Sequence, residues 1–556
     1  MRQLFATDAG ARGRLVAPAL CAILLVLAVL GFALRYPASI WSMTDYELDS
    51  LSGAINLAYR LGDLRFYPAP SMDKHPGVPH YLLSWIALAF AGFPRANSGL
   101  EFFRNVLDHV ERFHFIMIVL SALTGAAGIF LLMRGASRIV PVAVAAIGVL
   151  LWFGSTPYSL LSLLTLSIDS FGLALNALFV MVLWRVASEP RLEPSTMILA
   201  GAVGASAYLT KLVYINLPIA LGVAIGLRVL AARGGRGWAL LMAALFIYAS
   251  AIIVFVVALW FIEWSSFKGL LNFHTSVFFH TGAYGTGPSG IVGTSELLNA
   301  IRSIPADGTY AIPLALVGGV ILIAAGMATA IAGGDDRLPV AILATGAGVA
   351  SLLSAAAVLK HYSPHYSAAV ACSLPACVVA GYVALNSWAR LRRPLLAAVL
   401  VAAVLCIPAA STIRMTDGLM AAYWRRTIDA QDDRKVIARY IEQAPPMVGF
   451  AYAAPFREYG EGFLLASTEI PRLTFEYLAA ASRTISSATQ HLAQRDIGVF
   501  IIDKARFPTA QSVKAADNFN LLGPVEKYQA GDALIELKAA FVLVRRGGAA
   551  AARQGE

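Results

Sequence analysis

Long apolar stretches recur along the chain, with short polar segments between them. The stretches long enough to cross a bilayer lie near 15–34, 114–133, 139–156, 169–187, 197–210, 212–231, 238–261, 310–332, 338–358, 367–386 and 395–412. A spanning helix needs roughly 20 mostly apolar residues, and the pair at 197–210 and 212–231 meets that length least well. The pattern predicts an all-α polytopic membrane domain of about eleven transmembrane helices.

Two apolar stretches need separate treatment. The stretch at 79–93 is short and flanked by loop signals, so we expect it at the membrane surface. The first stretch, at 15–34, follows a basic start and exceeds the 7–15 apolar residues that are typical of a signal peptide. We therefore expect it to be a retained first helix.

The arginines of the short loops predict the orientation. With a cytoplasmic N-terminus, every loop on that side is basic, through Arg2, Arg12, Arg14, Arg134, Arg138, Arg185, Arg191, Arg228, Arg233, Arg236, Arg337, Arg390, Arg392 and Arg393. The short opposite loops at 157–168 and 361–366 contain no Lys or Arg. This agrees with the positive-inside rule, and counting 79–93 as a span would break it.

Three large polar pieces then fall on the outer side: loop 35–113, loop 262–309 and the C-terminal region. That region alternates helix-like stretches (428–443, 471–494) with strand-like runs (447–454, 497–503), which predicts a small extramembrane α/β domain. We expect a transmembrane domain at 1–412, an α/β domain at 413–545 and a disordered tail at 546–556.

Composition agrees with a chain that lipid largely solvates. Of its 556 residues 58% are hydrophobic and 14% charged, where soluble domains carry about a quarter charged residues. The formal net charge is +10. Because the basic residues lie in short loops and no nucleic-acid-binding motif appears, orientation explains that charge better than nucleic-acid binding.

The first outer loop carries an acidic cluster close to the first span. Asp45 and Glu47 lie in TDYELD, and Lys74 and His75 follow before a proline-broken turn. One carboxylate could take a proton from an acceptor while another orients it or holds a metal. A solvated loop with ordinary charges is the alternative.

Two charged residues interrupt the apolar stretches. Asp169, in SIDS, is either an N-cap or a functional residue at the end of a span. Lys211, in YLTKLVY, either snorkels to the surface or binds a phosphate.

Two later outer segments carry histidines. His280 precedes a glycine-rich run within 273–290, which is either a phosphate-wrapping loop or a flexible one. Lys360, His365 and Tyr366 crowd a short loop beside Pro364, which suits a lipid-phosphate headgroup better than snorkelling alone. The topology places all these candidates at one membrane face.

In the order of these motifs the chain resembles the GT-C superfamily of membrane glycosyltransferases. The branch it resembles contains bacterial relatives of protein O-mannosyltransferases and of the lipid A aminoarabinose transferase. The motifs run TDYELD, AINLAYRLGDLRFYP, KHPGVPHYLLSWIALAFAG, SIDS, YLTKLVY and KHYSPHYSAAVACSLP. The family usually has adjacent Asp-Glu, whereas Tyr46 separates Asp45 from Glu47, and His75 interrupts the Lys-Pro pair.

The resemblance implies an inverting transfer from a polyprenyl-phosphate-linked sugar to a lipid, glycan or protein acceptor, at the outer face of a bacterial inner membrane. Catalytic residues would be Asp45, Glu47 and Asp169, with Asp45 or Glu47 as general base. The donor phosphate would meet Lys74, His75, Lys211, His280, Lys360, His365 and Tyr366. Some relatives use a divalent cation. A secondary transporter and a non-catalytic membrane partner are the rival readings.

The orientation predicts the outcome of a reporter experiment. A periplasm-dependent reporter fused after residue 420 should be active, and the same reporter fused after Gly235 should be silent. The reverse pattern would contradict the prediction that the candidate residues all lie at the outer membrane face.

Overall fold

The structure of the chain is a computed structural model. It describes residues 9–37, 50–58, 77–91, 99–189, 192–231, 237–263, 267–281, 288–290, 292–334, 337–389, 394–443, 448–451, 456–457, 464, 484–486, 497–519 and 526–545. The first-loop candidates Asp45, Glu47, Lys74 and His75 lie outside these residues, as does the predicted tail at 546–556.

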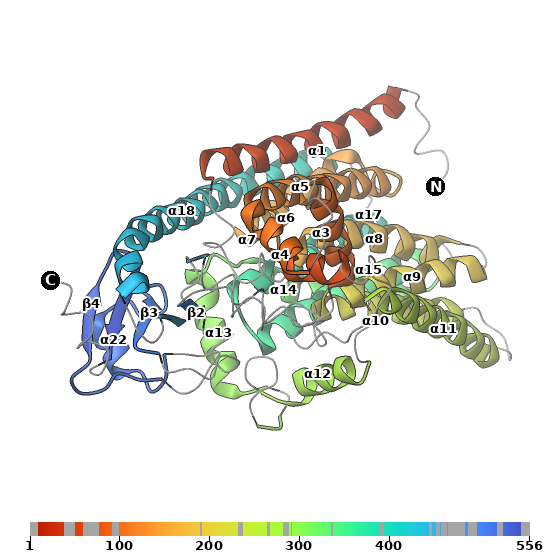
Figure 1. The fold of residues 1–556 in the computed structure, drawn as a ribbon. Coiled ribbons are helices and arrows are strands. Elements are labelled where there is room, and N and C mark those ends of the chain that lie inside the picture. The colour runs from red at the N-terminus through yellow and green to blue at the C-terminus, as the bar shows by residue number, and fades with distance from the viewer. Residues whose placement is uncertain are drawn as a thin grey trace. The chain divides into compact units, whose positions relative to one another are not determined.

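Within the described residues, eight helices are long and apolar enough to cross a membrane, or nine if one bent pair forms a single span. The chain is thus a multi-pass membrane protein (Figure 1). The unbent spans include or consist of α1 (Ala9–Arg35), α5 (Val110–Ala136), α8 (Gly172–Ser188), α10 (Asn216–Ala231), α11 (Gly237–Glu263), α14 (Ala311–Ala332), α15 (Leu338–Lys360) and α17 (Leu374–Ala389).

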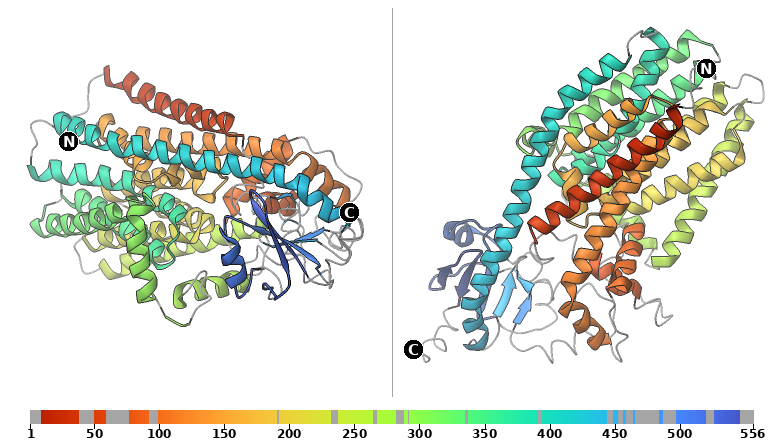
Figure 2. Two further views of the ribbon diagram at one scale, coloured as in Figure 1. Left: turned by 90° about the vertical axis from the view of Figure 1, so that its left-hand side faces the viewer. Right: turned by 90° about the horizontal axis from the view of Figure 1, so that it is seen from above.

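Two of the predicted stretches are not among these spans. The stretch at 197–210 lies in α9 (Pro194–Thr210), whose 17 residues make a helix of about 25 Å, shorter than a bilayer core. The stretch at 395–412 begins α18 (Pro394–Gln443), one helix of 50 residues that Figure 2 shows as a long unbroken rod, and most side chains of that stretch lie outside the described residues. That helix also contains the helix-like stretch predicted at 428–443.

The bent pair consists of α6 (Val142–Gly154) and α7 (Tyr158–Leu164), whose axes differ by 76°. Pro157 precedes α7 and cannot supply a backbone N–H to a continuous helix. Hydroxyl groups stabilise the break: Ser159 donates to the Trp152 carbonyl oxygen at 2.7 Å. Thr156 and Ser367 hydroxyls lie 2.7 Å apart, which joins the break to a later segment of the chain.

Shorter helical elements complete the helical part of the described residues. They are α3 (Val78–Phe90), α4 (Gly99–Asp108), α12 (Phe267–Phe279), α13 (Thr294–Ala306) and α16 (Ser367–Ala371), with the 3-10 turns η3 (Ile168–Phe171), η4 (Leu212–Ile215) and η6 (Pro364–Tyr366). The 13 residues of α3 are apolar but fall short of a span. Its placement at the membrane surface stays a prediction.

The C-terminal region contains a five-stranded sheet in the order β2-β1-β3-β5-β4. The strands are β1 (Val448–Ala451), β2 (Thr484–Ser486), β3 (Val499–Asp503), β4 (Ala533–Glu536) and β5 (Ala540–Val544), with helix α22 (Ala510–Ala515) between β3 and β4. β2, β1 and β3 are parallel, and β5 pairs antiparallel with both β3 and β4. Buried apolar residues on both faces form two cores, one of which includes Ile437 of α18.

The expected α/β character is therefore present, with differences in detail. β1 and β3 lie at the predicted strand-like runs. Residues 484–486 form a strand inside the stretch predicted as helix, because they pair in parallel with β1. β4 and β5 were not predicted, since each is short and one is largely exposed.

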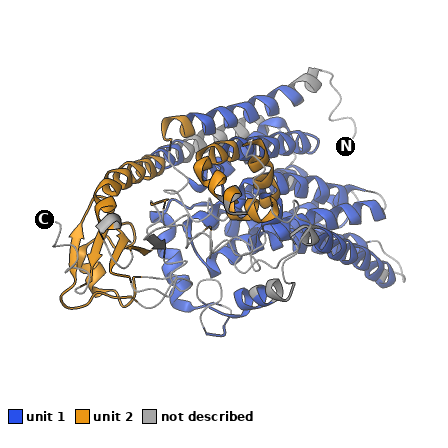
Figure 3. Cartoon of the chain, viewed as in Figure 1, with its two compact units in different colours: residues 1–31, 74–80, 118–417 blue, residues 32–73, 81–117, 418–556 orange. Residues whose placement is uncertain are grey.

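By contacts the chain divides into two compact units (Figure 3). The first comprises residues 1–31, 74–80 and 118–417, and the second 32–73, 81–117 and 418–556. The second unit thus combines the sheet with much of the first outer loop. The domain boundaries drawn from composition stay a prediction.

Candidate functional site

Asp169 lies in the turn that begins the α8 span. The N-cap of η3 is Ser167, whose hydroxyl accepts from the Asp169 backbone N–H at 3.3 Å. The N-cap interpretation of Asp169 is therefore wrong, because the neighbouring serine has that role. The Asp169 carboxylate accepts from the Ser167 hydroxyl at 3.2 Å and remains available to residues from other helices.

Leu166 gives this turn its direction. Its φ is +50°, in the left-handed region that glycine usually occupies. The following Ser167 N–H donates to the Ser162 carbonyl oxygen at 3.1 Å, the bond that closes a Schellman cap on α7. A fully buried leucine in this conformation costs about 1–2 kcal/mol, and its position directly before Ser167 and three residues before Asp169 agrees with strain at a functional site.

Lys211 is the partner of Asp169. It lies in extended backbone between α9 and η4, and its ammonium group is 2.7 Å from Asp169 Oδ2. The side chains are 6% and 1% exposed, so this is a buried ion pair. The snorkelling interpretation of Lys211 is therefore wrong, because the ammonium group has an internal anion.

A tyrosine completes the shell of Asp169. The hydroxyl of fully buried Tyr214, in η4, donates to Asp169 Oδ1 at 3.1 Å. Gly172 leaves the room for it, since a Cβ there would lie 2.0 Å from the Tyr214 hydroxyl oxygen. Asp169 thus accepts from Lys211, Tyr214 and Ser167, three donors that offset part of the cost of burying its charge.

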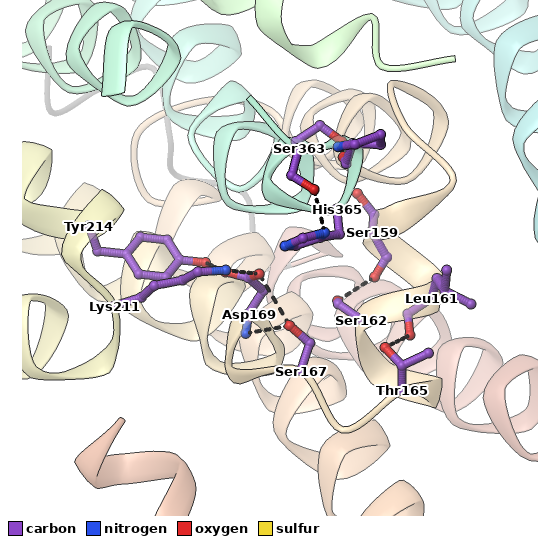
Figure 4. Close-up of polar contacts among 12 residues, drawn as sticks. Ser159, Leu161, Ser162, Thr165, Ser167, Asp169, Lys211, Tyr214, Ser363 and His365 are labelled. Atoms are coloured by element: carbon purple, nitrogen blue, oxygen red, sulfur yellow. Dashed lines mark hydrogen bonds and ion pairs between the residues drawn. The ribbon is translucent and has the colours of Figure 1, made fainter. Parts of the chain in front are cut away.

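The segment after α15 adds two rings above the ion pair. The Lys211 ammonium group lies 4.5 Å from the centre of the Tyr366 ring. His365 packs edge-on against that ring, and its Nδ1 is 2.9 Å from the Ser363 hydroxyl. Figure 4 shows Lys211 and Tyr214 meeting at Asp169, with His365 and Ser363 on a neighbouring segment. The structure thus brings Asp169, Lys211, His365 and Tyr366 together.

Lys360 and His361, at the end of α15, bond to the end of α12. The Lys360 ammonium group donates to the Phe278 carbonyl oxygen. His361 Nε2 lies 3.0 Å from the Val277 carbonyl oxygen. Basic side chains thus satisfy carbonyl groups at a helix C-terminus, where the helix dipole also favours them.

A cavity of about 590 Å³ connects these groups. Lys211, Lys360, His365 and Tyr366 all line it. The rest of the wall is mixed: apolar side chains come from η4, α12 and α15, and polar ones from α13 and the segment at 361–363. Four predicted donor-phosphate residues therefore share one cavity with His361 and Tyr362 of the same segment, and with Glu296 of α13, which has no distinctive sequence signal.

The arginine-rich helix ends lie away from this cavity. Arg228, in the last turn of α10, donates to the Glu189 carbonyl oxygen, and Glu189 pairs with Arg185 of α8. Asp169 lies just before the opposite end of α8, whose 17 residues extend about 25 Å. The arginines of these loops and the candidate site thus lie at opposite ends of α8. The positive-inside pattern of the sequence predicts this arrangement.

Two groups of predicted residues are not in this cavity. His280 pairs with Ser289 in an isolated antiparallel bridge and is not among the described residues that line the wall. Asp45, Glu47, Lys74 and His75 lie outside the described residues, so their roles stay predictions. Across the described part of the chain, no three His, Cys, Asp or Glu residues gather as metal ligands would.

No protein family model and no curated protein matches the chain. Among solved structures it is similar to ArnT from Cupriavidus metallidurans. The structure bound to undecaprenyl phosphate has a TM-score of 0.48 at 13% identity, covering 96% of this chain and 98% of that one. The apo structure has a TM-score of 0.47 at 13% identity, covering 97% and 99%.

The buried ion pair predicts a strong coupling between Asp169 and Lys211. Lys211→Met should lower the free energy of unfolding by about 3–5 kcal/mol, because it leaves a buried carboxylate without its cation. Lys211→Met combined with Asp169→Leu should be less destabilising than the sum of the single changes. Unfolding by SDS in mixed micelles measures all three.

The exposed pair Asp432–Lys435 of α18 is the matched control. At that pair the single and double substitutions should change the free energy of unfolding little and additively, because solvent screens the charges. Additive effects at Asp169 and Lys211 as well would contradict a coupled buried pair.

Proposed function

We propose that this protein is a membrane glycosyltransferase that takes its sugar from a polyprenyl-phosphate-linked donor. The observation that carries the proposal is the cavity in which Lys211, Lys360 and His365 share a wall with apolar side chains at the ends of membrane-length helices. A lipid phosphate has the two matching parts, an anionic headgroup and an apolar tail.

The donor phosphate binds on the basic side of the cavity. Lys360 and His361 lie at the end of α15, Lys211 directly precedes η4, and His365 lies in η6, and all four line the wall. An ammonium group acts as a point charge on phosphate, and the charge-assisted bonds stabilise the negative charge that develops as the phosphate leaves. Tyr366 contacts Lys211 and fixes the direction of its ammonium group.

The apolar part of the same wall receives the beginning of the lipid. Val213 and Ile215 from the η4 turn, Val277 and Phe278 from α12, and Leu359 from α15 contribute to it. These side chains lie within one cavity with the basic groups, so headgroup and first isoprenoid units can be bound together. Burial of that apolar surface adds about 25 cal/mol per Å².

Asp169 acts in this proposal as a positioning residue. Its carboxylate already accepts from Lys211, Tyr214 and Ser167 and is 1% exposed. A group so occupied has no free access to an acceptor hydroxyl. It positions the Lys211 ammonium group at the cavity, and proton removal belongs to a different carboxylate.

That carboxylate is in the first outer loop, where we favour Asp45 over Glu47. The acceptor hydroxyl oxygen bonds to the anomeric carbon of the sugar, and the bond from that carbon to the phosphate oxygen breaks. Its electron pair leaves with the polyprenyl phosphate, and the acceptor proton passes to the carboxylate. Attack opposite the leaving phosphate inverts the anomeric centre.

The acceptor is a hydroxyl-bearing lipid, glycan or protein, and the reaction takes place at the periplasmic face of a bacterial inner membrane. The secondary-transporter alternative fits less well. Transporters place their ionisable residues near the bilayer midplane between repeats, whereas Asp169 and Lys211 lie where α7, η3, α9 and η4 begin or end.

Substitution of the first-loop acids tests the reaction. In membranes that contain a polyprenyl-phosphate sugar with a labelled sugar, Asp45→Asn should lower transfer of the label by about 10²–10⁴-fold, because it removes the general base. Donor retention should be unchanged, since the amide has the same shape. Transfer is measured as label that moves from the donor to other membrane or protein fractions.

Glu47→Gln is the matched comparison. A loss of transfer in Glu47→Gln with near-normal transfer in Asp45→Asn would assign the base to Glu47. Near-normal transfer in both variants would refute the proposed reaction at this loop.

A further inference from the structure

Helix α13 (Thr294–Ala306) turns its polar side chains toward the cavity. Glu296, Asn299 and Ser303 line the wall, with Ala300 between them. Residues spaced by three and four lie on one face of a helix. This face of α13 thus lines the cavity, and the residues on its opposite face do not.

The opposite face is apolar and uncovered within the described residues. Leu298 is 48% exposed and Ile301 is 52% exposed, and Val292 just before the helix is also exposed. α13 buries Ala300 and Ile304 on its inner side, so apolar residues lie on both its buried and its exposed sides. A surface helix of a soluble protein has polar residues on its exposed side. A helix with its apolar face outward requires an apolar surrounding.

The apolar surface of α13 continues toward a membrane span. The turn at 307–310 leads directly from α13 into α14, whose Leu314 and Val317 are exposed as expected for lipid-facing residues. Tyr310, also exposed, lies at the start of that span, a position where interfacial aromatic residues gather. The exposed residues of α13 and α14 thus belong to consecutive helices of one compact unit.

The charge beside the exposed face of α13 and the direction of the helix both agree with a position at the membrane surface. Arg302 is exposed and lies four residues after Leu298, so a guanidinium group accompanies the apolar face. Long basic side chains at such positions reach the phosphates of lipid headgroups. In Figure 1, α13 also runs across the direction of the long apolar helix α11, as a helix lying along the membrane surface would.

From these observations we propose that α13 is an interfacial membrane helix. Leu298 and Ile301 insert among the headgroups and first acyl carbons, about 5–10 Å deep, while Glu296, Asn299 and Ser303 form the cavity wall. The partner is the phospholipid bilayer itself. One consequence rests on the proposed function. The cavity would then lie at the membrane depth at which the phosphate of a lipid-linked donor is found.

Photo-crosslinking in bilayers tests this placement without any assay of transfer. The photoreactive residue p-benzoylphenylalanine replaces Leu298 or Ile301 in the full-length chain, reconstituted with a phospholipid that carries a labelled acyl chain. Phe246, exposed on α11, is the lipid-facing reference, and Gln511 of α22 is the water-facing reference. Positions 299 and 303 report the cavity face.

Labelled-lipid adducts at 298 and 301 should approach the yield at 246, and the yields at 299 and 303 should be lower. Because Leu298 and Ile301 are about half exposed, the replacements should leave folding intact, which size-exclusion profiles verify. Yields at the level of residue 511, adducts to protein in place of lipid, or equal yields at all four α13 positions would each overturn the proposal. Lipid adducts at 298 and 301 in a protein whose unsubstituted form transfers no sugar would refute only the proposed function.

Discussion

The buried ion pair between Asp169 and Lys211 is the interaction on which the candidate site depends. Removing a carboxylate and an ammonium group from water costs several kcal/mol per ion, and the pair offsets this only with good geometry and further donors. Tyr214 and Ser167 supply those donors. The geometry in turn requires the Leu166 turn, the space beside Gly172 and the extended backbone at Lys211. The elements around the cavity are thus fixed by one charge pair, and the proposed phosphate site uses its cation.

The membrane architecture could be predicted from the sequence because the bilayer imposes a strong rule. Backbone groups in lipid must be satisfied within the segment, so apolar length alone identifies spans. The rule is less informative near its limits. The 17 residues of α9 fall just short of a span. In the C-terminal region, β2 could not be foreseen because its three residues are a strand only through pairing with β1.

The members of the site were easier to predict than their contacts. Asp169, Lys211, His365 and Tyr366 were identified because charged and aromatic residues at span ends are unusual in an apolar chain. Their pairing was not, since Lys211 is 42 residues from Asp169 and each has an ordinary local explanation. Tyr214 was missed because a tyrosine at a helix start has no distinctive sequence signal. His280 shows the converse: its position beside a glycine-rich run favoured the site, whereas its backbone pairs with Ser289.

The central claim is that the basic wall of the cavity binds a lipid phosphate, and the affinity for undecaprenyl phosphate in nanodiscs tests it most directly. Undecaprenol, which lacks the phosphate, provides the reference for tail binding, and Lys435→Ala on an exposed helix face provides the control variant. Charged hydrogen bonds contribute about 1.5–3 kcal/mol, so Lys360→Ala should weaken undecaprenyl phosphate binding roughly ten- to a hundredfold. It should leave undecaprenol binding unchanged. Equal affinity for the two lipids, or an affinity for undecaprenyl phosphate that Lys360→Ala does not alter, would contradict the account.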